Sequence, residues 1–534
     1  METIIIKNIS LPYKADPTEA LRIARGRVEK YLGRGSAIKE SINRRSVDAR
    51  KKNDIRFIYS VAVQVEGLPN AEKLQKMDGA LLEKAEPIPS QRGSEKLLAP
   101  PVIVGMGPCG MFAALVLAKA GYAPIVIERG KGIRERQKDV ELFMNEGRLD
   151  IESNIQFGAG GAGTFSDGKL MTRINDPMCR FVLEQFVELG APMEILVNAK
   201  PHIGTDNLVR VVDNAESMIR SLGGEVLYST RFIETIEKDS RVVGIKTNNG
   251  DIPCGALILA TGHSARDTYS YLIKEGFEVT AKDFSVGVRI EHLREDINKA
   301  MYGDADISLL SNAEYTLSHR EGKRGVYTFC MCPGGTVIAA ASEEGGVVVN
   351  GMSSYARDLE NSNSAVAVSI LKEDYGATPM GAIELQRRIE RAAFTLGGGD
   401  YSVPVQTVGD FLASRSGSEP SRIKPSYMNG RAYKCADLTL GLPTHVSDML
   451  RVGIRKFETK IKGFSVSDAL LSGYETRTSA PVRINRGDEL TVVGRDNLYP
   501  AGEGAGYAGG ITSAAVDGVR IAHKIISRYA AVLE

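Results

Sequence analysis

The chain has 534 residues, of which 43% are hydrophobic and 25% charged, and its 67 Lys and Arg residues nearly balance its 66 Asp and Glu residues. This length suffices for about three domains with a large core, and a net charge of +1 gives the whole molecule no electrostatic preference for nucleic acid or membrane. Because no apolar run reaches the roughly 18 residues of a membrane-spanning helix, no secretory signal pattern opens the chain, and six cysteines are unevenly spread, we expect a soluble cytoplasmic protein without a disulfide framework.

Residues 1–90 are predicted to form a small α+β domain with a linker. The order of elements is β-α-β-β, which indicates an α+β sandwich that could be ferredoxin-like. The linker begins near Gly67 and is rich in proline. The expected elements are strands over 3–9, 37–49 and 55–65 and helices over 17–32 and 71–82.

This first module is basic. Residues 1–66 carry 14 Lys and Arg against 8 Asp and Glu, a net charge of +6. A site for nucleic acid, an acidic protein or an anionic substrate is one interpretation. The other is a solvated strand edge, where charges discourage edge pairing, and the absence of interleaved stacking aromatics favours it. The clustered cations are Arg44, Arg45, Arg50, Lys51 and Lys52.

A glycine turn follows the first strongly apolar strand, predicted over 102–104. Gly105, Gly107 and Gly110 have GxGxxG spacing. The first glycine permits a sharp turn, the second lets a pyrophosphate approach the backbone, and the third lets helix and strand pack closely. A glycine turn without a ligand is the alternative.

The surroundings of this turn favour the dinucleotide interpretation. A helix is expected over 111–119, and its N-terminus would offer free N–H groups and partial positive charge to phosphate. A second strand, over 123–127, ends at Glu128, 23 residues after Gly105. A carboxylate at this position can accept hydrogen bonds from both ribose hydroxyls, so we expect an adenine-dinucleotide site.

A second glycine-rich segment, FGAGGAGTFSDGKL, spans 157–170. Its accessible backbone N–H groups suit a loop that lies against a planar or anionic ligand. A flexible surface loop is the alternative. Thr164, Ser166 and Lys169 are the polar side chains expected to face the ligand.

Short strands over 225–253, with a hairpin signal at Asn249-Gly250, lead to a buried strand over 256–259 that ends in ATGHSARD. A strand that breaks into Ala260-Thr261-Gly262 places backbone at the carboxyl edge of a parallel sheet, where dinucleotides lie. His263, delivered to that edge, is either a proton donor or a hydrogen-bonding group at the start of a helix.

Strands predicted over 285–290, 326–331, 337–341 and 347–349 indicate a further sheet within residues 281–460. It contains Cys330-Met331-Cys332. Two cysteines one residue apart on a strand point to opposite faces, which disfavours a disulfide between them. Cys330 is a candidate thiolate facing a cofactor, and buried small apolar residues are the alternative. The cysteine spacing does not fit zinc or iron–sulfur ligation, so no metal is expected.

The segment GYETRTSAP, at 473–481, combines polar residues with an apolar neighbourhood. Arg477 could hold a substrate carboxylate bidentately or form an Arg–Glu pair that braces a domain junction. Three further residues are weaker candidates for lining a substrate pocket: Arg289, Glu291 and His292.

Near the C-terminus, a strand reaching Pro500 leads into Gly502-Glu503, and Gly509-Gly510 opens a helix over 511–525. With this segment in place, the chain resembles the two-dinucleotide-binding-domain flavoproteins of the glutathione-reductase structural group at three places: Gly105-x-Gly107-x-x-Gly110 with Glu128, Ala260-Thr261-Gly262, and Gly502-Glu503 with the helix that follows. In order along essentially the whole chain, further segments are similar to an uncharacterised bacterial family of FAD-dependent dehydrogenases: GMGPCG, GAGTFSDGKL, ATGHSARD, FCMCPGG, ETRTSAP and GEGAGYAGGITSAAVDG.

The resemblance implies FAD rather than NAD, because NAD proteins have no reason to carry the third segment. In the flavoprotein group the late acid binds the ribityl or pyrophosphate part of FAD and is normally Asp, so Glu503 is longer by one methylene. The helix after it aims its N-terminus at the flavin pyrimidine. The residues assigned to FAD are Gly105, Gly107, Pro108, Cys109, Gly110, Glu128, Arg129, Gly163, Thr164, Ser166, Gly168, Lys169, Ala260, Thr261, Gly262, Gly502, Glu503, Gly509, Gly510 and Ile511.

We therefore expect an α/β protein with a Rossmann-like FAD-binding domain over 91–280 and 461–534, interrupted by a substrate domain with an antiparallel sheet over 281–460. The expected function is an oxidoreductase that transfers a hydride between a small molecule and flavin, with His263, Arg477 and Cys330 as candidate catalytic residues. No second GxGxxG marks an NAD(P)H domain, so a redox partner protein could complete the cycle. The alternative is an FAD-binding protein that docks to RNA through its basic N-terminal domain.

Overall fold

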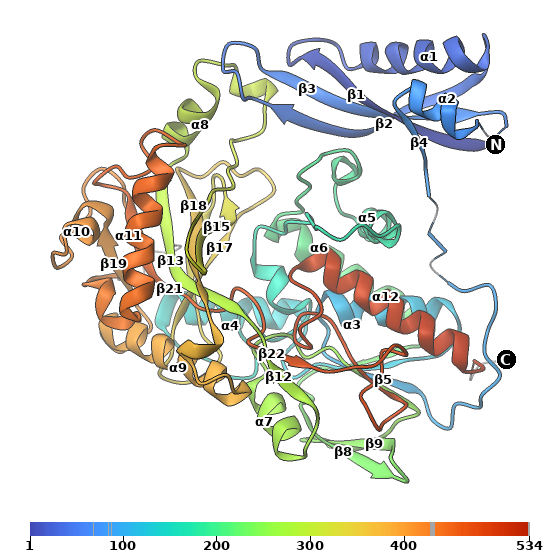
Figure 1. Ribbon diagram of the computed structural model, residues 1–534. Coiled ribbons are helices and arrows are strands. Elements are labelled where there is room, and N and C mark those ends of the chain that lie inside the picture. The colour runs from blue at the N-terminus through green and yellow to red at the C-terminus, as the bar shows by residue number, and fades with distance from the viewer. Residues whose placement is uncertain (68, 84, 87, 428–432, 532–534) are drawn as a thin grey trace.

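A computed structural model describes residues 1–531 apart from 68, 84, 87 and 428–432, and it begins with a four-stranded antiparallel sheet at one end of the molecule (Figure 1). The strand order is β2-β3-β1-β4. Residues 71–82 do not form one helix as predicted, because Asp78 adopts a φ of +54° and the chain then pairs with β1. The elements are β1 (Glu2–Pro12), α1 (Thr18–Leu32), β2 (Ala37–Asp48), β3 (Arg56–Val65), α2 (Ala71–Lys76) and β4 (Gly79–Leu81).

The outer edge of β2 contacts the rest of the molecule. Arg45 exchanges backbone hydrogen bonds of 2.8 Å with Val197 and Ala199, and its Nη2 donates to Asn198 Oδ1 at 3.2 Å. Arg44 Nη2 donates to the Ala199 carbonyl at 3.4 Å. Two of the five residues of the basic cluster therefore join this module to the segment 197–199, and Arg50, Lys51 and Lys52 remain exposed.

A five-stranded parallel sheet forms the centre of the second region, in the order β23-β11-β5-β6-β7. The predicted α/β class is thus confirmed. Successive strands β5 and β6 lie side by side, whereas β11 adds on the other side of β5, so the strand order reverses at β5, the place where open α/β sheets bind ligands. The strands are β5 (Pro101–Val104), β6 (Ile125–Ile127), β7 (Glu225–Leu227), β11 (Ala256–Leu259) and β23 (Leu498–Pro500).

Helices α3 and α12 lie alongside each other against this sheet (Figure 1). Their close approach depends on small residues, because a Cβ on Gly518 of α12 would overlap the carbonyl oxygen of Cys109 in α3. The predicted helix over 111–119 is longer by one turn and begins at Pro108, a residue suited to the first helical position. The helices of this region are α3 (Pro108–Lys119), α4 (Ile133–Glu146), α5 (Met178–Glu188), α6 (Thr205–Ser221), α7 (Arg266–Lys274) and α12 (Ile511–Arg528), with a small sheet of β8 (Phe232–Lys238), β9 (Arg241–Thr247) and β10 (Gly250–Pro253).

A seven-stranded sheet dominates residues 284–475, in the order β14-β15-β18-β13-β21-β19-β20. All neighbours are antiparallel except β19 and β20. The strands are β13 (Phe284–Leu293), β14 (Ser318–Glu321), β15 (Arg324–Cys332), β18 (Asn361–Ile370), β19 (Val403–Thr407), β20 (Tyr433–Cys435) and β21 (Leu470–Glu475), accompanied by α8 (Arg294–Tyr302), α9 (Pro379–Leu396), α10 (Val408–Leu412) and α11 (Thr444–Glu458).

Two ribbons complete the described fold. One pairs β16 (Thr336–Ala340) with β17 (Val348–Met352), and the other pairs β12 (Val279–Ala281) with β22 (Val482–Ile484). The second ribbon carries the chain into the seven-stranded sheet and back again, next to the parallel sheet. Among the described residues, every helix is too short or too polar to cross a bilayer.

Candidate functional site

A cavity of about 410 Å³ lies where the parallel sheet meets the seven-stranded sheet. Segments far apart in sequence line it, which is how the fold brings the glycine motifs together. Of the residues predicted to bind a cofactor or to act in catalysis, most line this cavity: Gly105, Gly107, Pro108, Cys109, Glu128, Arg129, Gly163, Ser166, Gly168, Lys169, Ala260, Thr261, Gly262, His263, Cys330, Arg477, Glu503, Gly509, Gly510 and Ile511.

Three predicted residues lie behind the cavity wall instead. Gly110 packs against the first glycine of the turn, since a Cβ there would overlap the carbonyl oxygen of Gly105. Thr164 is buried, and its Oγ1 donates to the Ala159 carbonyl at 3.4 Å. Gly502 sits against Cys109 and has a φ of +69°. Their side chains, or lack of one, shape the wall rather than face its interior.

The N-terminus of α3 faces the cavity through Gly107, Pro108 and Cys109. Gly105 has a φ of +106°, which an L side chain rarely adopts, and a Cβ there would overlap the Ala260 carbonyl. Gly107 has an ordinary φ of −75°. The atom nearest to its virtual Cβ is Gly161 Cα at 3.8 Å, so the space beside it is open.

Glu128, at the end of β6, is buried and holds three backbone N–H groups. Its Oε2 accepts from Met106 at 2.9 Å, and its Oε1 accepts from Gly130 at 3.0 Å and Gly158 at 2.9 Å. The carboxylate therefore ties the glycine turn to the second glycine-rich segment while still lining the cavity. Two carboxylate oxygens provide about four acceptor positions, so one remains for a ligand hydroxyl.

Arg136 of α4 organises the glycine-rich segment, a role that sequence reasoning missed. It is fully buried, and its guanidinium donates only to backbone carbonyls. Burial lowers the pKa of Arg136 to about 10. Because α4 shows an ordinary amphipathic pattern, nothing in its sequence distinguishes this arginine from a surface one. The five carbonyls belong to Asn154, Ile155, Gly158, Ala159 and Gly161.

Lys169 is held by an acid that was not predicted. Asp167 is buried and forms ion pairs with both Lys169 and Arg357. Burial would lower the pKa of Lys169, but Asp167 raises it above its usual range, so the ammonium remains charged at the cavity wall. Arg357 Nη1 also reaches Glu314 Oε1 at 2.7 Å. This network links the glycine-rich segment to the chain around β17.

Arg129 is not free to bind an anion through its whole guanidinium. Its Nε donates to Glu152 at 2.6 Å, its Nη1 donates to Asp267 at 3.0 Å, and it stacks 4.2 Å from the centre of the Phe157 ring. The arginine thus positions Phe157 at the cavity wall. Ser166 Oγ donates to the Gly163 carbonyl at 2.6 Å and stabilises the turn around it.

The turn at Gly502-Glu503 is held from α12. Asp517 Oδ2 accepts from the Gly502 N–H at 2.7 Å, and the same carboxylate pairs with Arg486 at 2.6 Å. Glu503 itself lines the cavity, and no hydrogen-bond partner is recorded for its carboxylate among the described residues. Burial raises the pKa of Glu503 to about 7, against the opposing charge of Lys282.

The contribution of Glu503 to the stability of the ligand-free protein is therefore expected to fall as pH rises towards neutrality. The pKa of Glu503 is higher in the folded state than its unfolded value of 4.5, so its contribution is complete below about pH 4.5 and is lost as pH rises through about 7. The difference in stability between the wild type and Glu503→Gln, measured by thermal unfolding from pH 5 to 8, should show this decline, worth at most about 3 kcal/mol. Taking the difference removes the opposing contribution of buried histidines such as His263, whose folded-state pKa is lowered. Glu489→Gln, which alters an exposed carboxylate, is the control, and parallel pH profiles for all three proteins would contradict the expectation.

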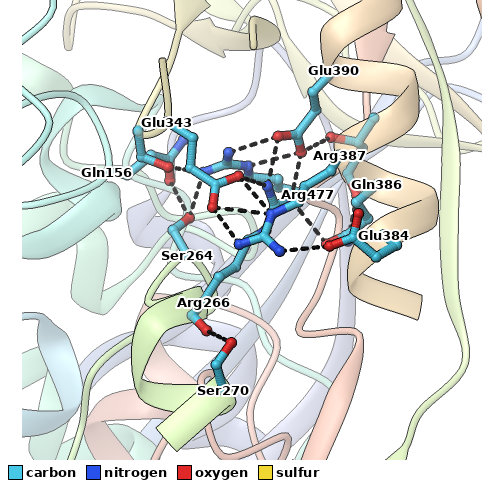
Figure 2. Close-up of polar contacts among 12 residues, drawn as sticks. Gln156, Ser264, Arg266, Ser270, Glu343, Glu384, Gln386, Arg387, Glu390 and Arg477 are labelled. Atoms are coloured by element: carbon cyan, nitrogen blue, oxygen red, sulfur yellow. Dashed lines mark hydrogen bonds and ion pairs between the residues drawn. The ribbon is translucent and has the colours of Figure 1, made fainter. Parts of the chain in front are cut away.

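Arg477 forms a brace rather than presenting a free guanidinium. Its Nε and Nη2 donate to Glu390 of α9 at 3.1 and 2.9 Å. Arg266, at the start of α7, pairs with the same carboxylate at 2.7 Å and with Glu343 at 2.6 Å (Figure 2). Burial would raise the pKa of Glu390, but the two guanidiniums hold it well below its usual range. The Arg–Glu alternative is thus observed, with Glu390 as the partner.

His263 lies beside this network and lines the cavity. Its Nδ1 is 2.9 Å from Ser264 Oγ, which also accepts from Arg477 Nη1 at 2.9 Å. Burial, followed by the charges of Arg477 and Arg266, lowers the pKa of His263 to about 4. The imidazole is therefore neutral near pH 7 and cannot begin a reaction as an imidazolium acid.

The two cysteines of the CMC segment do not point to opposite faces as predicted. The register between β15 and β18 shifts between Phe329 and Cys332, and Cys330 has a φ of +45°. This bulge breaks the alternation of side chains, and the Cys332 thiol donates a hydrogen bond to the Cys330 carbonyl at 3.4 Å. Strand periodicity alone cannot reveal a bulge, because the extra residue is defined only by pairing with β18.

The group Arg289, Glu291 and His292 lies on β13, outside the residues that line the cavity. Arg289 is fully buried and pairs with Glu475 at 3.0 Å. His292 packs 5.1 Å from the Phe464 ring, and its Nε2 lies 2.8 Å from the Phe464 carbonyl. Arg289 contacts two residues of the cavity wall. One is Glu475, and the other is Cys330, whose carbonyl accepts from Nη1 at 3.1 Å.

Comparison with known proteins identifies relatives. Residues 283–478 match the family model "FAD-dependent protein, C-terminal domain-like". A Clostridium beijerinckii protein, itself described as uncharacterized, is 47% identical over 536 residues, with 98% of this chain and 99% of that protein covered. FAD is therefore the cofactor of this protein.

Solved structures show weaker similarity. Glycine oxidase from Bacillus cereus has a TM-score of 0.33 at 10% identity, covering 82% of this chain and 99% of that one. A geranylgeranyl bacteriochlorophyll reductase-like protein from Thermoplasma acidophilum has a TM-score of 0.33 at 12% identity, covering 80% and 78%. CtdE in complex with FAD has a TM-score of 0.31 at 11% identity, covering 80% and 82%. These scores are too low to define the fold or function of this chain.

Proposed function

The chain belongs to the same family as the Clostridium beijerinckii protein, and residues 283–478 match a model of FAD-dependent proteins. We propose that it is an FAD-dependent oxidoreductase that transfers a hydride between a small-molecule substrate and the flavin. One observation carries the proposal: two helix N-termini and an acid-bearing strand end surround a single cavity. Residues at the start of α3, directly after β6 and at the start of α12 meet there although they are distant in sequence. When bound, FAD supplies two-electron chemistry.

The residues present fit this cofactor. The N-terminus of α3 offers N–H groups and partial positive charge to a pyrophosphate, and open space beside Gly107 lets a phosphate approach the backbone. Glu128 retains acceptor capacity for the adenosine ribose. Gly509 and Gly510 have nothing within 4 Å of their virtual Cβ positions, which leaves a cradle at the start of α12. We propose that this second N-terminus faces the flavin ring, as in the glutathione-reductase structural group.

The remaining polar residues hold the two halves of the site in place. The pair of Arg266 and Arg477 with Glu390 joins α7, α9 and the segment after β21, while neutral His263 can accept a proton but not donate one as a cation. A substrate would enter between the parallel sheet and β15. We therefore propose that the cofactor binds at the parallel sheet and the substrate binds beside the seven-stranded sheet.

The test is anaerobic reduction of the purified protein. The bound cofactor, released by denaturation, should be identified as FAD by mass spectrometry. After photoreduction, the flavin absorption should return on addition of an organic or protein electron acceptor, and a screen of donors should reduce it again. A flavin that no donor reduces and no acceptor oxidises would show a cofactor without turnover and would overturn the proposed hydride transfer.

A further inference from the structure

Two thiols stand at the cavity wall, and the proposed hydride transfer uses neither. Cys330 lines the cavity, and Cys332 lies behind it, fully buried. The bulge in β15 turns Cys330 out of the regular strand, and the Cys332 thiol donates a hydrogen bond back to the Cys330 carbonyl at 3.4 Å. The pair is thus one accessible sulfur backed by one inaccessible sulfur.

Cations surround this pair. Arg289, fully buried, donates from Nη1 to the Cys330 carbonyl at 3.1 Å, and its Nη2 has no hydrogen-bond partner among the described residues. Lys169 lines the same cavity. The neighbouring Cys332 thiol, helped by Lys169 and Arg289, outweighs burial and lowers the pKa of Cys330 below the usual range of a thiol. The neighbouring Cys330, together with burial, raises the pKa of Cys332 well above its usual range.

The other cysteines differ from this pair. Burial raises the pKa of Cys254 to about 12 and that of Cys435 to about 11, and the pKa values of Cys109 and Cys179 are also raised. At the bulge, by contrast, a thiol whose pKa is lowered lines a cavity, and a thiol whose pKa is raised lies behind it. This is the arrangement of an attacking sulfur and a resolving sulfur.

We propose that Cys330 and Cys332 form a redox-active dithiol that reduces disulfide-bonded substrates entering the cavity. The Cys330 thiolate attacks a substrate sulfur, the substrate S–S bond breaks, and one substrate thiolate leaves and takes up a proton. Loss of the charge on Cys330 lets Cys332 release its proton and attack the Cys330 sulfur, which expels the second substrate thiolate. The balance is one substrate disulfide reduced to two thiols and one Cys330–Cys332 disulfide formed, with two electrons transferred.

This exchange needs only the two thiols and a disulfide, so its test is independent of the proposed hydride transfer. The probe is oxidised glutathione added to the reduced full-length holoprotein, followed by N-ethylmaleimide and tryptic mapping. Cleavage after Arg324 and Arg357 yields a peptide of residues 325–357 that contains both cysteines and no other. We expect two equivalents of glutathione to be released per chain and this peptide to resist alkylation.

Variants at the two cysteines separate the role of the attacking sulfur from that of the resolving sulfur. Cys332→Ser should release one equivalent of glutathione and retain a second on Cys330, because no resolving sulfur is present. Cys330→Ser should release none, and Cys435→Ser, at a half-buried cysteine outside the cavity, should behave like the wild type. Full alkylation of both thiols in the wild-type peptide after treatment with oxidised glutathione would overturn the proposal.

A second measurement needs no variant. At pH 6, iodoacetamide should modify Cys330 about tenfold faster than an ordinary thiol, because the larger thiolate fraction outweighs the lower intrinsic nucleophilicity of a low-pKa sulfur. The rates are read for Cys330 and Cys435 in the same digest. A rate for Cys330 at or below that of Cys435 would overturn the proposal.

Discussion

Replacement of Gly107 by alanine is expected to leave the protein folded while weakening FAD binding by about 5- to 150-fold. Alanine tolerates the φ of −75°, and the nearest atom to its Cβ would be 3.8 Å away. The methyl group would instead occupy the space through which the pyrophosphate reaches the backbone. A steric cost of about 1–3 kcal/mol corresponds to the stated range. Equilibrium dialysis of FAD against the ligand-free protein measures it.

Gly110→Ala provides the contrast, because its Cβ would overlap the carbonyl of Gly105 whether or not FAD is present. This variant should lower the unfolding temperature of the ligand-free protein, whereas Gly107→Ala should not. Gly26→Ala, in α1 with nothing within 4 Å, is the matched control and should keep FAD affinity unchanged. Wild-type affinity in Gly107→Ala would contradict the assigned phosphate position.

Glu390→Gln is expected to destabilise the protein by about 3–5 kcal/mol, because it removes the carboxylate shared by two buried guanidiniums. Arg266 and Arg477 are 2% and 7% exposed and pair with Glu390 at 2.7 and 2.9 Å. The variant should unfold at a lower denaturant concentration than the wild type, as followed by circular dichroism and by flavin release.

The matched control is Glu384→Gln on the same helix. Glu384 pairs with Arg387 at 2.6 Å but is 52% exposed, and exposed pairs contribute only about 0–1 kcal/mol. Equal unfolding midpoints for Glu390→Gln and Glu384→Gln would show that the shared carboxylate does not hold α7, α9 and the segment after β21 together.

The cofactor motif could be predicted from sequence because its determinants are local. A buried strand, a glycine turn and a helix start follow one another within residues 102–119, and each depends on its own backbone conformation. The positive φ of Gly105 and the close contact of Gly110 with it are examples. The prediction of one helix over 71–82 is wrong because its second half depends on a distant segment. That half forms β4, which pairs with β1.

The polar network around the site could not be predicted in the same way. The sequence placed a glutamate two residues before Arg477, yet Arg477 pairs with Glu390, 87 residues away. Glu475 instead pairs with Arg289 across β13 and β21. Strand alternation would place residues 475 and 477 on the same face, but β21 ends at Glu475. The packing of α9 against the segment that follows then decides which carboxylate Arg477 meets.

By itself, the sequence predicted an FAD-binding α/β protein and the glycines that we expect to approach the cofactor, because spacing and backbone freedom are properties of short segments. Tertiary structure alone decided that Arg136 holds the glycine-rich segment, that Arg477 is a brace, and that Cys330 meets Cys332 at a bulge. Each of these depends on groups brought together by packing between elements, and pair distances across elements are not encoded in any one segment.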